Sequence, residues 1–253
     1  MSDQATMRHE HPQHWETSIW PLIMAVVILV ALPLGFTFKF AYNQPLVAVL
    51  CLVVGVPLII ASIVGWVNEA IAGGEGLSAP AMGWFILAEA MIFISFFTSY
   101  WYMRLSAPDW PPGGTPELPV VLPLVMTAAL VASSFTFHAG EVVLGRGERG
   151  RFVAWLVVTM LLGTAFIGMS IYEWTHLFGQ GFNFETNAYS TIFYTITGFH
   201  GAHVAVGLGI FLAMLVPALS HRTNDGFVRT AGIYWHFVDI IWLFVVSQVY
   251  YWY

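Results

Sequence analysis

The feature that most constrains this chain is a series of seven apolar segments, each long enough to cross a lipid bilayer as a helix. A membrane helix needs about 20 mostly apolar residues, and its own hydrogen bonds satisfy the backbone where water is absent. The segments span residues 18–38, 45–67, 80–104, 118–144, 152–177, 188–219 and 229–252. Only 9% of the residues are charged, too few to cover a soluble core of this size. We therefore predict an all-α membrane protein with seven transmembrane helices.

Lysine and arginine residues predict how the chain is oriented, because they are enriched in cytoplasmic loops. On the side of the N-terminus lie Arg8, Arg146, Arg149, Arg151, Arg222 and Arg229, whereas the opposite side has Lys39 and Arg104. We expect a cytoplasmic N-terminus and, after an odd number of spans, a C-terminus outside the cell. Residues 1–17 are polar and lack the apolar core of a signal peptide, so we predict a cytoplasmic N-terminal tail.

Three pairs of histidine and carboxylate lie three residues apart within the apolar segments. Such spacing places both side chains on one face of a helix, where an imidazole can offset the burial of a carboxylate. The pairing predicts either internal polar contacts between helices, or a proton relay or metal site. The pairs are His138 with Glu141, Glu173 with His176, and His236 with Asp239.

Glu89 differs from these carboxylates, because no charged residue lies within ten positions of it. An isolated carboxyl group in an apolar helix favours its neutral, protonated form. Two interpretations remain open at this point. Glu89 is either a protonated acid that is hydrogen-bonded to a neighbouring helix, or a group that exchanges protons or contacts lipid.

The sixth segment contains His200 and His203, which share a helix face. A haem held between His200 and His236 is one interpretation, and hydrogen-bonded core histidines are the other. On another face, Gly201, Ala205 and Gly209 form a small-residue stripe, which we expect to let a second helix approach closely.

Several motifs resemble subunit III of the haem–copper oxygen reductases, the cytochrome c oxidase subunit 3 family. Residues 197–204 (TGFHGAHV) are similar to its sixth-helix signature, and residues 234–244 (YWHFVDIIWLF) to its seventh. Residues 84–93 (WFILAEAMIF) are similar to its buried-glutamate segment, followed by a Trp-Pro-Pro turn at 110–112. Weaker similarities lie in the fourth and fifth segments. The resemblance covers about residues 80–253, and the first two spans agree in position and hydropathy only.

The resemblance implies a fold of two N-terminal helices (residues 18–67), splayed from a five-helix bundle (residues 80–253) by a lipid-holding cleft. It implies an accessory subunit without its own redox centre, in a complex that reduces oxygen to water and pumps protons. Subunit I would bind this chain directly, subunit II would belong to the same complex, and these partners would hold the haem and copper. Glu89 would correspond to the family's buried glutamate beside the lipid cleft, where it supports proton uptake. His200, His203, His236 and Asp239 would be structural, and the phospholipids would be structural too. The complex would lie in the plasma membrane of a prokaryote.

Other classes of membrane protein compete with this assignment. A seven-helix retinal protein requires a lysine in its last helix, and the single lysine here is Lys39 in the first span. A stand-alone ion or proton transporter is compatible with the buried carboxylates, although the sequence shows no internal repeat. Within the same superfamily, the alternative is subunit III of a quinol oxidase.

Overall fold

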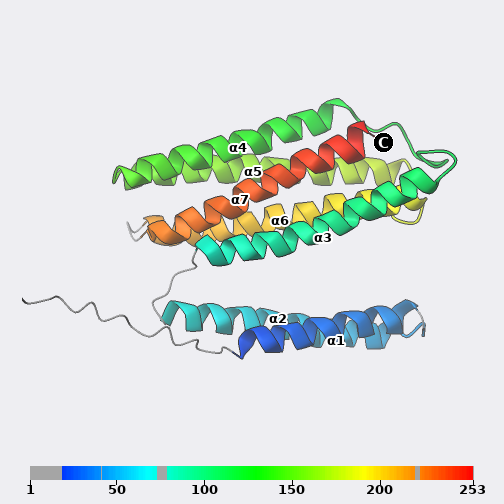
Figure 1. Cartoon of the computed structure of the whole chain (residues 1–253), viewed down its shortest axis with the longest axis horizontal. Coiled ribbons are helices and arrows are strands. Elements are labelled where there is room, and N and C mark those ends of the chain that lie inside the picture. Colours follow the sequence, from blue (N-terminus) through cyan, green and yellow to red (C-terminus); the bar gives the residue numbers. More distant parts are fainter. Residues whose placement is uncertain (1–18, 41, 73–78, 220–222, 253) are drawn as a thin grey trace, which may run out of the picture. The chain divides into compact units, whose positions relative to one another are not determined.

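A computed structural model describes residues 19–40, 42–72, 79–219 and 223–252 of the chain, so the predicted tail at 1–17 lies outside the described residues. The helices are α1 (Trp20–Phe40), α2 (Pro45–Ala72), α3 (Ala79–Ser106), α4 (Val121–Gly145), α5 (Arg149–Gly179), α6 (Ala188–Leu219) and α7 (Asp225–Val245), followed by the π-helix η1 (Val246–Tyr251). All seven α-helices are long and apolar enough to cross a membrane. Figure 1 colours them along the sequence, from blue for α1 to orange and red for α7 and η1. The prediction of an all-helical fold with seven spans is confirmed.

The chain divides into two compact units, Met1–Gly76 and Leu77–Tyr253. In the first unit, α1 and α2 pack side by side along their length. Gly55 of α2 permits the close approach, since a Cβ atom there would lie only 2.7 Å from the Cβ atom of Ala31. These two helices therefore form a helical hairpin.

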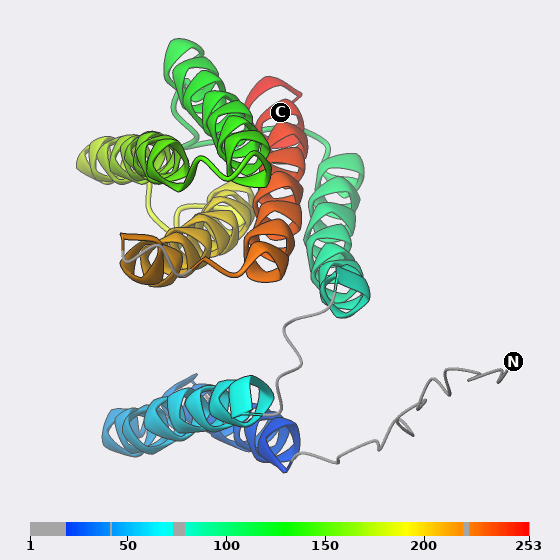
Figure 2. The same cartoon turned by 90° about the vertical axis from the view of Figure 1, so that its left-hand side faces the viewer.

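In the second unit, α7 is the most enclosed helix. It contacts α3, α4 and α6, while α5 contacts α4 and α6, and Figure 2 shows this arrangement end-on. In the membrane-spanning part of α7, 61% is buried, against a third or less in the other four helices of the unit. The outer helices thus leave most of their apolar surface for lipid or partner subunits.

The start of α7 lies four residues before the predicted boundary at 229. The cause is Asn224, whose side-chain oxygen accepts a 3.1 Å hydrogen bond from the backbone N–H group of Phe227. An asparagine N-cap of this kind satisfies one of the free donors in the first helical turn. Hydropathy alone missed the boundary because Asp225 and Arg229 bring charge into the first two turns of α7.

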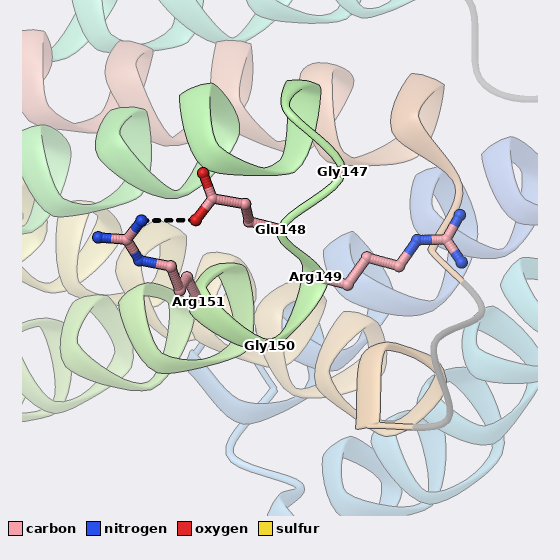
Figure 3. Close-up of a pocket in the computed structure, with 5 residues that line it drawn as sticks. All are labelled: Gly147, Glu148, Arg149, Gly150 and Arg151. Carbon is pink, nitrogen blue, oxygen red and sulfur yellow. Dashed lines mark hydrogen bonds and ion pairs between the residues drawn. The ribbon is translucent and has the colours of Figure 1, made fainter.

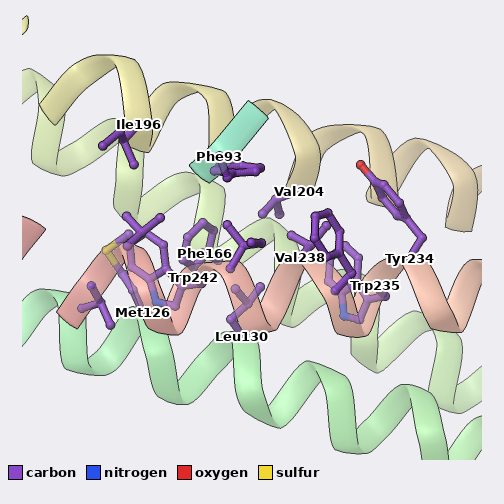
Figure 4. Close-up of a cluster of buried hydrophobic side chains, with 14 of the residues drawn as sticks. Phe93, Met126, Leu130, Phe166, Ile196, Val204, Tyr234, Trp235, Val238 and Trp242 are labelled. Atoms are coloured by element: carbon purple, nitrogen blue, oxygen red, sulfur yellow. The ribbon is translucent and has the colours of Figure 1, made fainter. Parts of the chain in front are cut away.

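The core of the second unit is built around two tryptophans of α7, seven residues apart (Figure 4). Trp242 packs edge-on against Phe166 at a ring-centroid distance of 4.7 Å, and Trp235 packs against Phe211 at 4.8 Å. Both indole N–H groups donate to α4, Trp235 to the Ser133 hydroxyl at 3.0 Å and Trp242 to the Thr127 hydroxyl at 2.9 Å. These hydrogen bonds define the register of α4 against α7.

The chain ends in η1, which widens the last turns of the seventh span. A π-helix shifts the usual backbone hydrogen bonds. Two backbone carbonyl groups of η1 accept hydrogen bonds from tyrosines of other helices. The Tyr100 hydroxyl of α3 donates to the Gln248 carbonyl at 2.8 Å, and the Tyr189 hydroxyl of α6 donates to the Val249 carbonyl at 2.6 Å. Helices α3 and α6 are thereby tied to the C-terminal end of the bundle.

Candidate functional site

Glu89 of α3 lies beside His203 of α6, and this pair is the candidate functional site. The Oε2 atom of Glu89 is 3.1 Å from the Nε2 atom of His203. Both side chains are largely but not completely buried, with 18% of Glu89 and 11% of His203 exposed. The partner lies 114 positions away along the chain, so a search for neighbouring charges around Glu89 could not find it.

The other ring nitrogen of His203 determines what the pair can do with protons. Its Nδ1 atom lies 2.7 Å from the backbone carbonyl oxygen of Phe199. A carbonyl oxygen only accepts, so Nδ1 carries a hydrogen and donates it. The 3.1 Å contact between Nε2 and the carboxyl group of Glu89 then calls for one further proton between them, because two unprotonated acceptors would repel each other at this distance. Wherever that proton resides, the pair is neutral overall, and its burial costs little compared with a lone ion.

Aromatic rings surround the imidazole of His203 and hold it in place. Phe199 and Phe93 lie at ring-centroid distances of 4.7 and 5.2 Å, and the ring of Tyr234 is stacked at 6.4 Å. The Tyr234 hydroxyl also donates a 3.1 Å hydrogen bond to the backbone carbonyl of His203. Tyr234 is a further residue of the site that the sequence did not single out, although it begins the seventh-helix motif. The arrangement fixes one orientation of the imidazole and keeps the shared proton at a defined position.

Of the three predicted local pairs, the structure brings together His138 and Glu141. The Nδ1 atom of His138 lies 3.6 Å from a carboxyl oxygen of Glu141 near the end of α4. The carboxyl group of Glu141 also lies against Gly232 of α7, where a Cβ atom would be 2.7 Å from Oε1. This pair lies at the α4–α7 contact, with His138 largely exposed.

Glu173 and His176 are not paired, which corrects the second predicted pair. Glu173 is buried and accepts a 2.7 Å hydrogen bond from the hydroxyl group of Tyr250. His176 is exposed, stacks on Tyr172, and lies 3.0 Å from the side-chain nitrogen of Gln180. Residues three apart still differ by about 60° in direction around a helix, and in α5 the edge of the buried face falls between Glu173 and His176. Tyr250 was missed because it lies in the last turns of the chain.

His236 and Asp239 do not contact each other either, although both lie near Ser134 of α4. The Nδ1 atom of His236 lies 2.6 Å from the Ser134 hydroxyl oxygen of α4, in the α4–α7 contact. Asp239 is buried, and within the described part of the chain neither of its carboxyl oxygens has a hydrogen-bond partner. The expected His236–Asp239 contact is therefore replaced by a His236–Ser134 contact between helices.

His200 is completely buried among aromatic rings rather than placed opposite His236. Its ring lies 5.0 Å from that of Trp242 and 5.6 Å from that of Phe166, between α5 and α7. His236 instead faces α4. The two imidazoles belong to different helix contacts, so the structure does not bring them together as a pair of haem ligands. Among the described residues, no three His, Cys, Asp or Glu side chains gather as they would around a metal ion.

The small-residue stripe of α6 does not receive another helix of its own unit, as far as the described residues 79–219 and 223–252 show. A Cβ atom built at Gly201 or Gly209 would meet no heavy atom of the described chain within 4 Å. The close approach occurs instead at Gly207, where a Cβ atom would lie 2.5 Å from the ring of Trp235. The stripe therefore faces outward.

Comparison with known proteins places this arrangement in a family. The family model described as cytochrome c oxidase subunit III matches residues 11–253. A protein of Synechocystis sp. named cytochrome c oxidase subunit 3 is 38% identical over 170 residues, which cover 66% of this chain and 72% of that protein. Proteins of the same name from Danio rerio and Allomyces macrogynus are 34% and 32% identical, over 97% and 96% of this chain and 99% and 93% of their own lengths. The chain belongs to the cytochrome c oxidase subunit III family.

Proposed function

We propose that this chain is an accessory, non-catalytic subunit of a proton-pumping cytochrome c oxidase, the complex that reduces oxygen to water. Family membership supports its place in an oxidoreductase complex. In this proposal it binds subunit I directly, subunit II belongs to the same assembly, and haem and copper lie in those partners. Its own contribution is to stabilise subunit I and to support proton uptake.

The outward face of α6 supports direct contact with a helix of subunit I. Gly201 and Gly209 leave open space on that face, and the neighbouring Val206 is 55% exposed. In a bilayer, small residues let two helices approach closely, and van der Waals packing then holds them together. A partner helix could therefore lie on α6 over several turns.

The Glu89–His203 pair is the observation that carries the proposed role in proton uptake. The two hydrogen-bond distances of His203 support one proton shared between the carboxyl and imidazole groups, and both side chains keep some exposure. When one proton enters from outside the helix bundle as the shared proton leaves, the pair is neutral before and after the exchange, so no unpaired charge remains in the apolar bundle. We propose that bound phospholipids complete this route. Orientation follows the arginine distribution, with a cytoplasmic N-terminus in the plasma membrane of a prokaryote.

A glutamine at position 89 separates proton exchange from structure. The amide of Glu89→Gln can still donate to the Nε2 atom of His203, so the contact between α3 and α6 persists while the exchangeable proton is lost. We expect the purified oxidase to keep its subunits and visible spectrum but to turn over more slowly, and to pump fewer protons per electron in vesicles. The control Glu141→Gln changes another carboxyl group beside a histidine and should behave like wild type. Wild-type turnover and pumping by Glu89→Gln would contradict the proposal.

Purification of the native protein tests the accessory role itself. We expect this chain to be isolated in mild detergent with a larger subunit that carries haem and copper. Isolation as a lone chain without metal would favour a transporter instead, and a haem spectrum from the lone chain would contradict a non-catalytic subunit.

A further inference from the structure

A tight turn with three arginines connects α4 and α5. We count as this turn the segment from Gly145, the last residue of α4, to Arg151 in the first turn of α5, and its arginines at positions 146, 149 and 151 are all exposed. Glu148 is the one acidic residue among them, and its carboxyl group pairs with Arg151. The turn therefore has an excess of positive charge at the end of two membrane-spanning helices.

The backbone of this turn is well defined by hydrogen bonds. Gly147 has a φ of +81°, its N–H group donates to the Leu144 carbonyl at 2.8 Å, and the N–H group of Glu148 donates to the Val143 carbonyl at 3.0 Å. This pair of bonds is the Schellman arrangement, in which a glycine ends a helix in the left-handed conformation. The arginines thus extend from a fixed frame.

The turn borders an open hollow of about 740 Å³, lined by residues 147–151 (Figure 3). No heavy atom of the described chain lies within 4 Å of a Cβ atom built at Gly147 or Gly150, so the space beside the backbone is free. Figure 3 shows the side chains of Arg149 and Arg151 extending in opposite directions from the turn. One small anion could not contact both guanidinium groups at once, but two separate groups could each contact one.

Exposed apolar residues lie on both helices next to the turn, before it on α4 and after it on α5. Trp155 of α5 lies one helical turn from Arg151, about 6 Å along the helix, and 37% of it is exposed. Leu161, further along α5, is 64% exposed, and Val142 of α4 is 40% exposed. Tryptophan side chains favour the boundary between headgroups and hydrocarbon. This position of Trp155 predicts that the guanidinium groups lie at headgroup depth, with apolar surface for acyl chains next to them.

We propose that Arg149 and Arg151 each bind the phosphate group of an anionic phospholipid, one on either side of the α4–α5 turn, in the leaflet that this turn faces. Arginine donates several N–H groups to phosphate oxygens, and Arg151 retains donors beyond its bond to Glu148. Arg146 adds positive charge that attracts negatively charged lipid. This inference depends on the chain's spanning a membrane, and on neither the proton-uptake role nor the orientation.

The test counts lipids on the intact oxidase complex. The purified complex is stripped of loosely bound lipid, titrated with phosphatidylglycerol or phosphatidylcholine, and analysed by native mass spectrometry. We expect Arg149→Gln and Arg151→Gln each to remove one retained phosphatidylglycerol and to weaken its binding about fivefold, with phosphatidylcholine unaffected. The double variant should lose both, and the charge-preserving Arg149→Lys and Arg151→Lys should retain most of the binding.

Other outcomes would overturn the proposal. Unchanged phosphatidylglycerol counts in both glutamine variants would show that the turn binds no anionic lipid. Loss of a partner subunit with unchanged lipid counts would assign the turn to a protein contact. Loss of both lipids in either single variant would contradict two separate sites. Equal subunit content of wild type and variants, measured in the same spectra, shows that the complex has remained assembled.

Discussion

The hydroxyl group of Tyr250 donates a 2.7 Å hydrogen bond to the Oε2 atom of Glu173, which joins the last turns of the chain to α5. Both side chains are buried, and the Oε1 atom of Glu173 has no hydrogen-bond partner among the described residues. A carboxyl group in such a position depends strongly on the one donor it has. The C-terminal π-helix and α5 therefore stabilise each other through this contact.

Removal of that donor should destabilise the bundle. Tyr250→Phe keeps the aromatic packing but leaves both carboxyl oxygens of Glu173 without a donor, at a cost of about 1–3 kcal/mol. We expect this subunit to be released from the purified complex at a lower transition temperature. Fluorescence or differential scanning calorimetry would measure that temperature.

The neighbouring Tyr251 provides the matched control for this substitution. Its hydroxyl donates to the Val120 carbonyl, but Tyr251 is 43% exposed, so water can replace the lost bond. Tyr251→Phe should change the transition far less than Tyr250→Phe. Equal effects of the two substitutions would contradict a special role for the Glu173 contact.

The sequence predicted what depends on local composition, and missed what depends on distant partners. All seven spans could be located because a bilayer demands long apolar segments. The His138–Glu141 contact agrees with the spacing, but the same spacing failed for Glu173 with His176 and for His236 with Asp239. The partner of Glu89 was not, since His203 comes from α6, and the partner of Glu173 comes from η1. Spacing defines a helix face but not the element that packs on it.

Glycines of α6 illustrate the same limit and give a second prediction. Gly207 packs under Trp235, which is fully buried, and a Cβ atom there would lie 2.5 Å from its ring. Gly207→Ala must displace the indole ring of Trp235 or push α6 away from α7. Overpacking of this kind lowers the free energy of unfolding by about 1–3 kcal/mol. We expect a lower thermal transition and reduced recovery of this subunit in the complex.

Gly209, two residues further along α6, is the control for Gly207. Its Cβ position is open, and alanine is a better helix former than glycine by roughly 1 kcal/mol. Gly209→Ala should leave the stability of the isolated subunit unchanged or slightly higher. If both substitutions lower the stability of the isolated subunit equally, the assignment of Gly207 to the α6–α7 contact is wrong. Lower affinity of Gly209→Ala for the rest of the complex would support the proposed docking face.

The tryptophan–hydroxyl contacts between α4 and α7 give a third prediction. Trp235 donates to Ser133, and both residues are buried. A double-mutant cycle of Trp235→Phe and Ser133→Ala should yield a coupling free energy of about 0.5–1.5 kcal/mol, the range found for hydrogen bonds between membrane helices. The measurement is reversible unfolding of the subunit in detergent. The control pairs Trp235→Phe with Thr127→Ala. Because Thr127 accepts its hydrogen bond from Trp242 and not from Trp235, these two substitutions should show almost no coupling.

The tautomer of His203 is the final prediction, and it tests the geometry of the candidate site directly. Because Nδ1 donates to the Phe199 carbonyl, its hydrogen should remain in place whether or not Glu89 is ionised. In the ¹⁵N-histidine-labelled chain, we expect Nδ1 of His203 to give the chemical shift of a protonated nitrogen, in wild type and in Glu89→Gln alike. The Nε2 shift should differ between the two, since an amide donor there replaces a carboxyl group. An unprotonated Nδ1 would mean that the imidazole does not donate to Phe199, and the proton shared with Glu89 would lose its structural basis.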